Sequence, residues 1–578
     1  MEPFLLQGLH VDLARMTASA EGLPEGESAR WLGGRGLGVR FLLPHSTRAW
    51  DDPALPLVFA VGPLTAAGLA ACGRTYVTSR SPLTGTLFTE DAGGDFGAQL
   101  RRCGLLYLRI TGRSATPCRL TIDEGRATLE PDAWRPGSGD PAEGWDGRVA
   151  SVGAAAMSGV RFASIVFDAP WAADRGGLGL VMASRNLLRI RVRGSVPPTV
   201  ADPGGLAQAR EQALRLIHAA PALCGPCGIS RYGTATLFDL AASRRMLPTR
   251  NFRATAFEGA GALSATAFAH GTGAACDGCP VACGRVDPAG TPFPSFSALT
   301  HLGPLVGNGD PSTAVAANAF CREAGLDPVT AGATIAAFCE IRRGDLVEGE
   351  LQALLRSIVA RDGASDTLAE GSRRASERLG MPSASMAVKG LELPGFDPRG
   401  ALGTALSYAV STRGGDEAHA MAYVHEVLRK PVATDRFSLD GKARIVKTSE
   451  DLYAAADALG ICRFAFFGAS LEEYSGAFRS ITGLASGQSA LLEAGERIAA
   501  AERLFNEQSG FAFSDDVLPA RFHDAPGTPG DGIFTPPIDR AAFSEALGHY
   551  AALRGIGVDG RLLPETIARL GLTEEARP

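Results

Sequence analysis

Along roughly the first two hundred residues, short apolar runs alternate with Gly and Pro, a pattern typical of strands separated by turns. The tripeptide Asp123-Glu124-Gly125 separates two of these runs and predicts a hairpin turn. The runs are rich in β-branched and aromatic residues, which favour strands. We therefore expect a β-rich region with strands at residues 57–61, 76–79, 105–110, 119–122, 148–152 and 162–167.

From Leu206 onward, apolar residues recur at helical spacing among Ala, Leu, Arg and Glu. A helix is also expected to begin near Thr448, whose hydroxyl can pair with Asp451 as a capping box. The remainder of the chain is therefore predicted to be mainly helical, with further helices at residues 207–220, 332–341, 350–360 and 490–505.

A chain of 578 residues is longer than one hydrophobic core supports, because cores stop growing near roughly 250 to 300 residues. Prolines and glycines at residues 197–205 suit neither strand nor helix and mark a first boundary, and a second lies near residues 394–403. We predict an α+β fold with a β-rich domain at 1–204 and two mainly helical domains at 205–400 and 401–578.

The charge balance limits the partners that we expect. The 56 basic and 62 acidic residues give a net charge of -6, and no long basic run is present, so nucleic acid and anionic membranes are not expected as partners. The first residues lack a signal-peptide pattern, and no apolar run reaches about 18 residues. These features predict a cytoplasmic protein.

The 11 cysteines are too few for a disulfide scaffold in a chain of this length. Cys276, Cys279 and Cys283 stand in one glycine-flanked loop, and Cys462 is the candidate fourth ligand. Zinc is disfavoured because it usually takes two pairs of ligands, and radical enzymes that use S-adenosylmethionine have the opposite order of gaps. The alternative is that these cysteines are small buried apolar residues. We predict an iron–sulfur site.

Three glycine-rich stretches lie in the β-rich part, at residues 33–38, 91–97 and 175–179. Bare backbone of this kind allows a close approach and can offer N–H donors to phosphate. Tight packing or a bulge would produce the same glycines. The stretches are therefore candidates for ligand contact and do not identify a ligand.

Taken in order, the motifs resemble the aldehyde:ferredoxin oxidoreductases, which carry tungsten or sometimes molybdenum on two pyranopterins. The resemblance extends over nearly the whole chain. The matching segments are Gly34-Arg35-Gly36-Leu37, Gly62-Pro63-Leu64-Thr65, Ser81-Pro82-Leu83-Thr84-Gly85, Arg175-Gly176-Gly177, the Cys276 loop, Leu393-Pro394, Asp397-Pro398-Arg399-Gly400, Asp457-x-x-Gly460-x-Cys462 and Ala501-Glu502-Arg503-Leu504-Phe505-Asn506.

The resemblance implies that the four cysteines ligate a [4Fe-4S] cluster and that Arg74 bridges cluster and pterin. It implies that the carboxylates of Asp327 and Asp457 hold the pterins, in motifs that include Gly332 and Gly460. Helix capping is the alternative for both aspartates. The positions implied around the pterin phosphates and a bridging magnesium are Asp91, which stands where the family enzyme has asparagine, and Gly93, Gly94, Arg175, Gly176 and Gly177.

The family oxidises an aldehyde with water to a carboxylic acid and passes electrons through the cluster to ferredoxin or an iron–sulfur partner. The reaction needs a general acid or base. Ser297 stands where the family has a glutamate, and Glu417 stands where it has a histidine, with His419 two residues later. We predict that His419 and Glu417 transfer protons at a site that includes Ser297, with His301 and His425 behind them.

Several alternatives stay open at this point. The substrate could instead be a 2-oxo acid or an aromatic thioester, or the chain could be a non-catalytic electron-transfer or assembly protein that carries only the cluster. Cys224-Gly225-Pro226-Cys227 has the form of a thioredoxin-type pair, which we expect in a loop near the substrate channel. In the family, a Glu-x-x-His motif can hold a metal ion between two subunits. Residues 316–319 stand at that position here and lack these ligands, so the bridge is not expected. A homodimer and a separate electron-transfer subunit both remain open.

Overall fold

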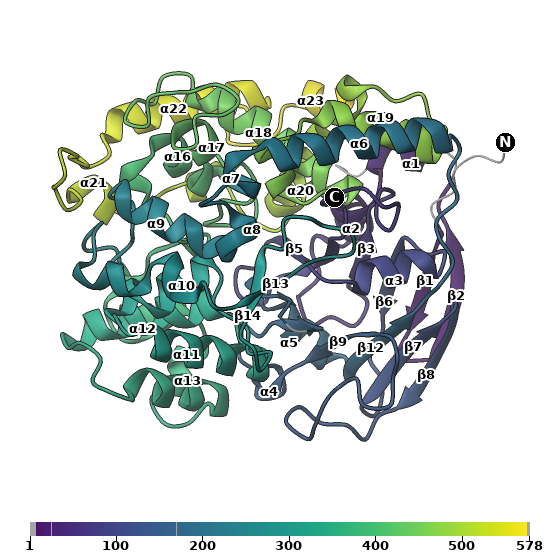
Figure 1. Cartoon of the computed structure of the whole chain (residues 1–578), viewed down its shortest axis with the longest axis horizontal. Helices are drawn as coiled ribbons and strands as arrows, with labels where there is room; N and C mark the ends of the chain where they lie inside the picture. The colour runs from purple at the N-terminus through teal and green to yellow at the C-terminus, as the bar shows by residue number, and fades with distance from the viewer. Residues whose placement is uncertain (1–6, 25, 169, 575–578) are drawn as a thin grey trace.

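The computed structural model describes residues 7–24, 26–168 and 170–574. A β-rich part made by the first two hundred residues lies beside a larger helical part (Figure 1). The α+β fold predicted from the sequence is therefore confirmed. Within the described ranges, no helix combines the length and the apolar character needed to cross a membrane.

Two six-stranded sheets form the β-rich part, in the orders β2-β1-β6-β3-β4-β5 and β11-β10-β9-β12-β7-β8. Neighbouring strands are antiparallel except for the parallel pairs β1–β6 and β7–β12. The bounds are β1 Gln7–Asp12, β2 Thr17–Gly22, β3 Leu57–Val61, β4 Thr75–Arg80, β5 Leu87–Ala92, β6 Tyr107–Thr111, β7 Cys118–Asp123, β8 Arg126–Pro131, β9 Arg148–Val152, β10 Ile165–Phe167, β11 Ala172–Ala173 and β12 Leu187–Arg193. Two short hairpins, β13 Thr272–Ala274 with β14 Gly284–Val286 and β15 Ala387–Val388 with β16 Leu391–Glu392, lie in the helical part.

The predicted strands β3 and β9 are confirmed with the predicted ends, and the turn between β7 and β8 is confirmed by the left-handed backbone of Glu124 and Gly125, with φ of 48° and 83°. Strands β1, β2, β5 and β12 were not predicted. β2 is mostly exposed, and arginines alternate with the apolar residues of β12, so neither forms a plain apolar run.

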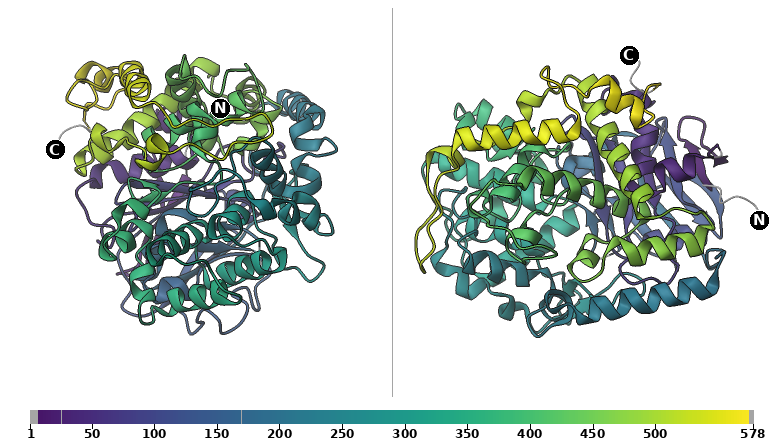
Figure 2. Two further views of the ribbon diagram at one scale, coloured as in Figure 1. Left: turned by 90° about the vertical axis from the view of Figure 1, so that its left-hand side faces the viewer. Right: turned by 90° about the horizontal axis from the view of Figure 1, so that it is seen from above.

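The helical part begins with α6, which runs along the outside of the molecule and packs against α19 (Figures 1 and 2). The bounds are α1 Glu27–Trp31, α2 Gly34–Leu42, α3 Phe96–Arg102, α4 Ala154–Met157, α5 Leu178–Ser184, α6 Pro203–Ala219, α7 Pro221–Cys224, α8 Ile229–Tyr232, α9 Thr236–Ser243, α10 Phe296–Leu302, α11 Pro311–Ala324, α12 Pro328–Arg342, α13 Glu350–Ala360, α14 Ser365–Leu368, α15 Ser372–Arg378, α16 Leu402–Val410, α17 Tyr423–Glu426, α18 Lys442–Leu459, α19 Leu471–Thr482, α20 Gln488–Gln508, α21 Arg521–Asp524, α22 Arg540–Arg554 and α23 Pro564–Arg569.

Two details of the helix prediction are wrong. α18 begins at Lys442, so Thr448 lies inside the helix and caps nothing. A tertiary contact fixes the earlier start, because the buried Lys442 ammonium lies 2.9 Å from the Glu426 carboxylate. The proline at 203 was assigned to a linker, yet it opens α6, since proline fits the first turn of a helix and Asp202 caps the exposed N–H groups. The two domain boundaries stay predictions.

Helix α2 connects the two parts, because it packs on β3 and β4 with one face and on α18 and α20 with the other. Glycines make this approach possible. A methyl group on Gly34 would stand 2.2 Å from the Asp457 carbonyl oxygen, and one on Gly62 would stand 1.9 Å from the Leu459 carbonyl carbon. The end of α18, and with it Cys462, is thereby held against the turn that follows β3.

The packing of α18 on α20 predicts a contrast between two helical glycines. A methyl group on Gly495 of α20 would lie 1.9 Å from the Asp451 carbonyl oxygen, whereas one on Gly476 of α19 would meet no atom within 4 Å. We expect Gly495→Ala to lower the free energy of unfolding by about 1–3 kcal/mol through overpacking, and Gly476→Ala to raise it by about 0.5–1 kcal/mol. Thermal unfolding of the two variants measures this, and equal shifts would contradict it.

Candidate active site

The four thiols predicted to hold a cluster line one small cavity. Cys276, Cys279 and Cys283 come from the loop between β13 and β14, and Cys462 follows α18, where its N–H donates to the Ala71 carbonyl at 2.7 Å. No three His, Cys, Asp or Glu side chains of the described residues are close enough to hold one metal ion together. The four thiols face one common space, and the ligation of a cluster there stays a prediction.

Hydrogen-bond donors surround these sulfur atoms. The Gly94 N–H donates to the Cys276 sulfur at 3.3 Å, and Arg74 donates to the Cys462 sulfur at 3.2 Å. Burial raises the pKa of Cys276 to about 11 and raises that of Cys283 further. Without a bound metal these thiols keep their protons, and metal binding would have to release them.

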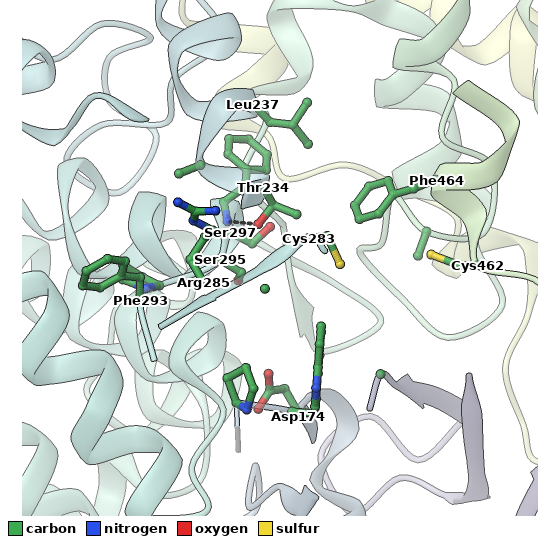
Figure 3. Close-up of a pocket in the computed structure, with 18 of the residues that line it drawn as sticks. Asp174, Thr234, Leu237, Cys283, Arg285, Phe293, Ser295, Ser297, Cys462 and Phe464 are labelled. Atoms are coloured by element: carbon green, nitrogen blue, oxygen red, sulfur yellow. Dashed lines mark hydrogen bonds between the residues drawn. The ribbon is translucent and has the colours of Figure 1, made fainter. Parts of the chain in front are cut away.

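A larger cavity of about 290 Å³, here called the main cavity, shares Arg74, Cys283, Cys462 and Phe464 with the small one. Cys462 and Phe464 stand on one side of it, and Ser295 and Ser297 stand on the other (Figure 3). Most of its remaining wall is apolar and aromatic. The apolar residues that line it include Trp171, Tyr232, Leu237, Phe268, Phe293, Phe296, Met421 and Tyr423.

A chain of charges joins the main cavity to the end of α18. Asp91 at the end of β5 lies 3.0 Å from Arg74 and 2.9 Å from Arg463, and these arginines are among the charges that lower its pKa to about 2 despite burial. Arg463 also donates to Asp457 at 2.8 Å. The pair of arginines thus keeps Asp91 ionised beside the predicted cluster.

Behind that chain lies a buried ion-pair network. Both oxygens of Glu502 accept from Arg35 at 2.7 Å, and Arg35 also donates to Asp457 at 3.2 Å. A nitrogen of Arg35 lies 3.2 Å from Nδ1 of His419, whose pKa is lowered well below its ordinary value by burial and then by the positive charge of Arg35. His419 is therefore a neutral, buried imidazole and does not line the main cavity.

Asp327 caps α12 by accepting from the Val329 N–H at 2.9 Å, so the capping alternative raised for it describes part of its role. Its second oxygen has no hydrogen-bond partner among the described residues, although Nε of Arg175 lies 3.4 Å away. Burial raises the pKa of Asp327 to about 6. Asp457 does not cap a helix, and its carboxylate is held by arginines instead.

Close packing or a helix end explains why glycine stands at several of the predicted cofactor-binding positions. A methyl group on Gly177 would stand 2.0 Å from the Arg161 carbonyl oxygen, and one on Gly332 would stand 2.5 Å from that of His301. Gly460 ends α18 with φ of 89°. Gly93, which lines the main cavity, and Gly94 both lie against Trp171, and Gly176 lies against Phe88. Contact with a phosphate stays a prediction for all of them.

Glu417 and Ser297 both line the main cavity, as predicted for a reaction site. Burial, reinforced by the neighbouring Asp416, raises the pKa of Glu417 to about 8. One of its carboxylate oxygens has no hydrogen-bond partner among the described residues. A carboxyl group with such a pKa can exchange a proton near neutral pH, which a serine hydroxyl cannot do.

The two further candidate histidines, His301 and His425, and the Cys224–Cys227 pair do not line the main cavity. His301 is fully buried, and its two ring nitrogens lie 2.7 and 3.0 Å from the carbonyl oxygens of Ser297 and Leu393. It therefore connects α10 to the segment before residue 394. His425 lies near the Val432 carbonyl at 3.3 Å, outside the main cavity. Cys224 ends α7, and Cys227 is exposed in the following loop.

The residues present fit a large polar cofactor. Buried polar atoms around the site have no hydrogen-bond partner within the described part of the chain, although buried groups are usually paired. They comprise donors and acceptors, as a pterin with phosphate groups would require. These atoms are Nε of Arg74, Arg175 and Arg463, Oδ2 of Asp327, Oε2 of Glu417 and Nε2 of His419.

Sequence reasoning assigned no role to Arg463, although it connects Asp91 to Asp457. The available signal was its position directly after Cys462. The pairing of Arg35 with Glu502 was also missed, because residues 467 positions apart show no periodic relation. Both residues did stand in segments quoted for the resemblance, and a buried arginine there needed a carboxylate.

Comparison with known proteins points to one family along nearly the whole chain. A family model described as the aldehyde ferredoxin oxidoreductase N-terminal domain matches residues 8–194, and one described as domains 2 and 3 of that family matches residues 208–572. The chain is 33% identical over 607 residues to a tungsten-containing aldehyde ferredoxin oxidoreductase of Pyrococcus abyssi, which covers 98% of each chain. It is 32% identical over 606 residues to that of Pyrococcus furiosus, again over 98% of each chain.

A solved structure shares the fold. The active site complex BamBC of benzoyl coenzyme A reductase, in complex with 1,5 dienoyl-CoA, superposes with a TM-score of 0.84 over 99% of this chain and 97% of that chain, at 20% identity. The resemblance drawn from the motifs is confirmed by the family models and by the relatives that are more than 30% identical. The chain therefore belongs to the aldehyde ferredoxin oxidoreductase family, a family of tungsten-containing oxidoreductases.

Proposed function

We propose that this chain oxidises an aldehyde to a carboxylic acid and passes the electrons to ferredoxin or an iron–sulfur partner. The observation that carries the proposal is the sharing of Arg74, Cys283 and Cys462 between the small cavity of thiols and the main cavity. In this arrangement a cluster would adjoin the space where a substrate binds. A tungsten or molybdenum bis-pyranopterin, when bound, supplies the two-electron redox chemistry.

The chain's own groups have separate tasks in this proposal. Cys276, Cys279, Cys283 and Cys462 hold a [4Fe-4S] cluster, and Arg74 donates toward both cluster and pterin. Asp91, a carboxylate that stays charged with a pKa of about 2, would be the residue that holds a magnesium ion if one binds with the pterin.

A second set of residues holds the pterin. The free oxygen of Asp327 accepts from its N–H edge, and Arg175 pairs with phosphate. Asp457 is a weaker candidate for such a contact, because Arg35 and Arg463 already engage one of its oxygens. Tyr76 lies 3.5 Å from the other oxygen, which leaves that atom the more available of the two.

Glu417 is the proposed proton acceptor, because it lines the main cavity and has a raised pKa. The oxidation of an aldehyde with water releases two protons, so a base is needed. Ser297, which also lines the main cavity, can donate or accept a hydrogen bond but cannot store a proton. His419 takes no proton in this scheme, because burial keeps its ring neutral and the ring does not line the main cavity. Its Nε2, which has no partner among the described residues, is available to the cofactor.

The experiment that tests the function combines two measurements on protein purified without oxygen from cells supplied with both metals. Elemental analysis is expected to find iron together with tungsten or molybdenum. Reduction of benzyl viologen is expected with aldehydes and not with 2-oxo acids, and an aromatic thioester is not expected to reoxidise reduced viologen. Iron without either heavy metal, or turnover of a thioester alone, would contradict the proposal.

A prediction follows for the pterin contact of Asp327. Asparagine caps helices as well as aspartate does, so Asp327→Asn is expected to keep the fold while it loses a charged acceptor for the pterin. The content of tungsten or molybdenum per protein should fall by about threefold to tenfold. A charge-assisted hydrogen bond is worth about 1.5–3 kcal/mol, and the neutral asparagine oxygen can still accept a weaker one. Asp310→Asn is the matched control, because Asp310 caps α11 in the same way at the surface. Equal metal loss in both variants would assign Asp327 to capping alone.

A further inference from the structure

Four arginines line the main cavity, and three of them face carboxylates. Arg74 and Arg463 share Asp91, at 3.0 and 2.9 Å. Arg322 donates with two nitrogens to Asp174, one of them at 2.6 Å. Each of these three guanidiniums therefore has at least one carboxylate partner inside the protein.

The fourth, Arg285, takes part in no ion pair among the described residues. It lies in the middle of β14, and its stem passes over Gly233, where a methyl group would stand 2.5 Å from Cγ. One nitrogen donates to the Gly271 carbonyl across the β13–β14 hairpin. Nε is buried and without a partner among the described residues. A guanidinium with five donors is thus held in place with most of its hydrogen-bonding capacity unused.

Apolar side chains and two serine hydroxyls surround Arg285. Phe293, Phe268 and Leu237 line the same cavity, and Figure 3 shows Arg285 with Ser295 and Ser297 on the side opposite Cys462. Arg285 is only partly buried, so water can reach its guanidinium, and an anion that replaces this water would gain charge-assisted hydrogen bonds. A carboxylate matches the planar fork of a guanidinium, and a single unpaired arginine suits a monoanion better than a doubly charged phosphate.

We propose that Arg285 is a specificity-determining residue that binds a carboxylate of the substrate, so that the cavity takes an aldehyde with an apolar body and an acidic far end. The substrate class rests on the proposed function, whereas the carboxylate site does not. Electrons and protons follow the oxidation already described, since the second carboxylate takes no part in bond making.

Steady-state kinetics with a matched pair of aldehydes tests this. With benzyl viologen as acceptor, the wild-type holoenzyme is expected to show a KM for 4-carboxybenzaldehyde about 10-fold to 100-fold below that for benzaldehyde. Arg285→Gln should remove this difference by raising the first KM, with kcat and the benzaldehyde KM within about twofold of wild type. Arg285→Lys should restore part of the preference, because it keeps the charge and loses the fork.

Arg231→Gln is the matched control, because Arg231 is exposed on α8, next to a residue of the cavity wall, and is not part of that wall. It removes one positive charge without touching the substrate, so the preference should remain. Equal KM values of the two aldehydes in the wild-type enzyme, or a parallel rise of both in Arg285→Gln, would overturn the proposal.

Calorimetry separates this proposal from the proposed function. The holoenzyme is titrated with the unreactive ketones 4-acetylbenzoate and acetophenone, and the acid is expected to bind about 10-fold or more tightly in wild type and not in Arg285→Gln. If no aldehyde is oxidised but this preference is found, the function fails and the carboxylate site stands. If aldehydes are oxidised but the acid binds no better than acetophenone, the site is refuted and the function stands.

Discussion

Cys462→Ser is expected to abolish electron transfer while the fold is kept. The thiolate of Cys462 is the predicted ligand that comes from outside the Cys276 loop, and it is held in place by its own backbone bond to Ala71. A serine keeps that backbone bond and loses the soft sulfur ligand that iron–sulfur clusters require. Viologen-linked turnover should fall by about 100-fold or more, and iron content and the low-temperature EPR signal of the reduced cluster should fall with it.

The control for this variant is Cys227→Ser, since Cys227 is an exposed thiol away from both cavities. Its iron content, EPR signal and turnover should match those of wild type. Circular dichroism of both variants checks that the fold is unchanged. A Cys462→Ser protein with the full iron content and the wild-type EPR spectrum would show that the cluster is held by other residues.

Glu417→Gln is expected to lower kcat by about 10²-fold to 10⁴-fold, the usual contribution of a positioned general base. The wild-type rate should rise with pH through the Glu417 pKa of about 8, since the carboxylate is the form that accepts a proton. Glutamine cannot ionise, so this limb of the pH profile should disappear in the variant. Measurement of kcat/KM between about pH 6 and pH 10 reports both effects.

Although Glu417→Gln should lower kcat, it is expected to raise the free energy of unfolding at alkaline pH. The folded-state pKa of Glu417, about 8, lies above its ordinary value of 4.5, so the folded protein binds the proton more tightly than the unfolded chain does. Below pH 4.5 the Glu417 carboxyl carries a proton in both the folded and the unfolded state, so its burial does not lower the free energy of unfolding. As the pH rises from there to about 8 the cost of burying the charge grows, and beyond that it is constant. Glu417→Gln should therefore be more stable than wild type at alkaline pH.

The control is Glu507→Gln. Burial raises the pKa of Glu507 to about 7, yet it accepts from the Leu562 N–H at 3.2 Å and does not line the main cavity. Its substitution should leave both the rate and the shape of the pH profile unchanged. If Glu417→Gln kept the alkaline limb of the profile, another group would have to be the proton acceptor, and His419 would be the next to replace.

The sequence by itself determined the fold class and the family, and it supplied the candidate site residues. Short motifs achieved this because their spacing is local: three cysteines in one loop, a turn at Glu124 and Gly125, and apolar runs such as β3 are all encoded by near neighbours. It also placed Glu417 and Ser297 among the candidates, and both line the main cavity.

Only the tertiary structure decided which charges face one another. Arg35 meets Glu502 and Arg463 meets Asp91 across long stretches of chain, and Lys442 meets Glu426 of another helix, so no periodicity indicates these pairs. The same holds for the burial of His419 outside the cavity lining and for Arg285, which lines the cavity without an ion pair among the described residues. Ion pairing and burial depend on the distance between elements in space, and that distance is set by packing, which a single sequence does not record.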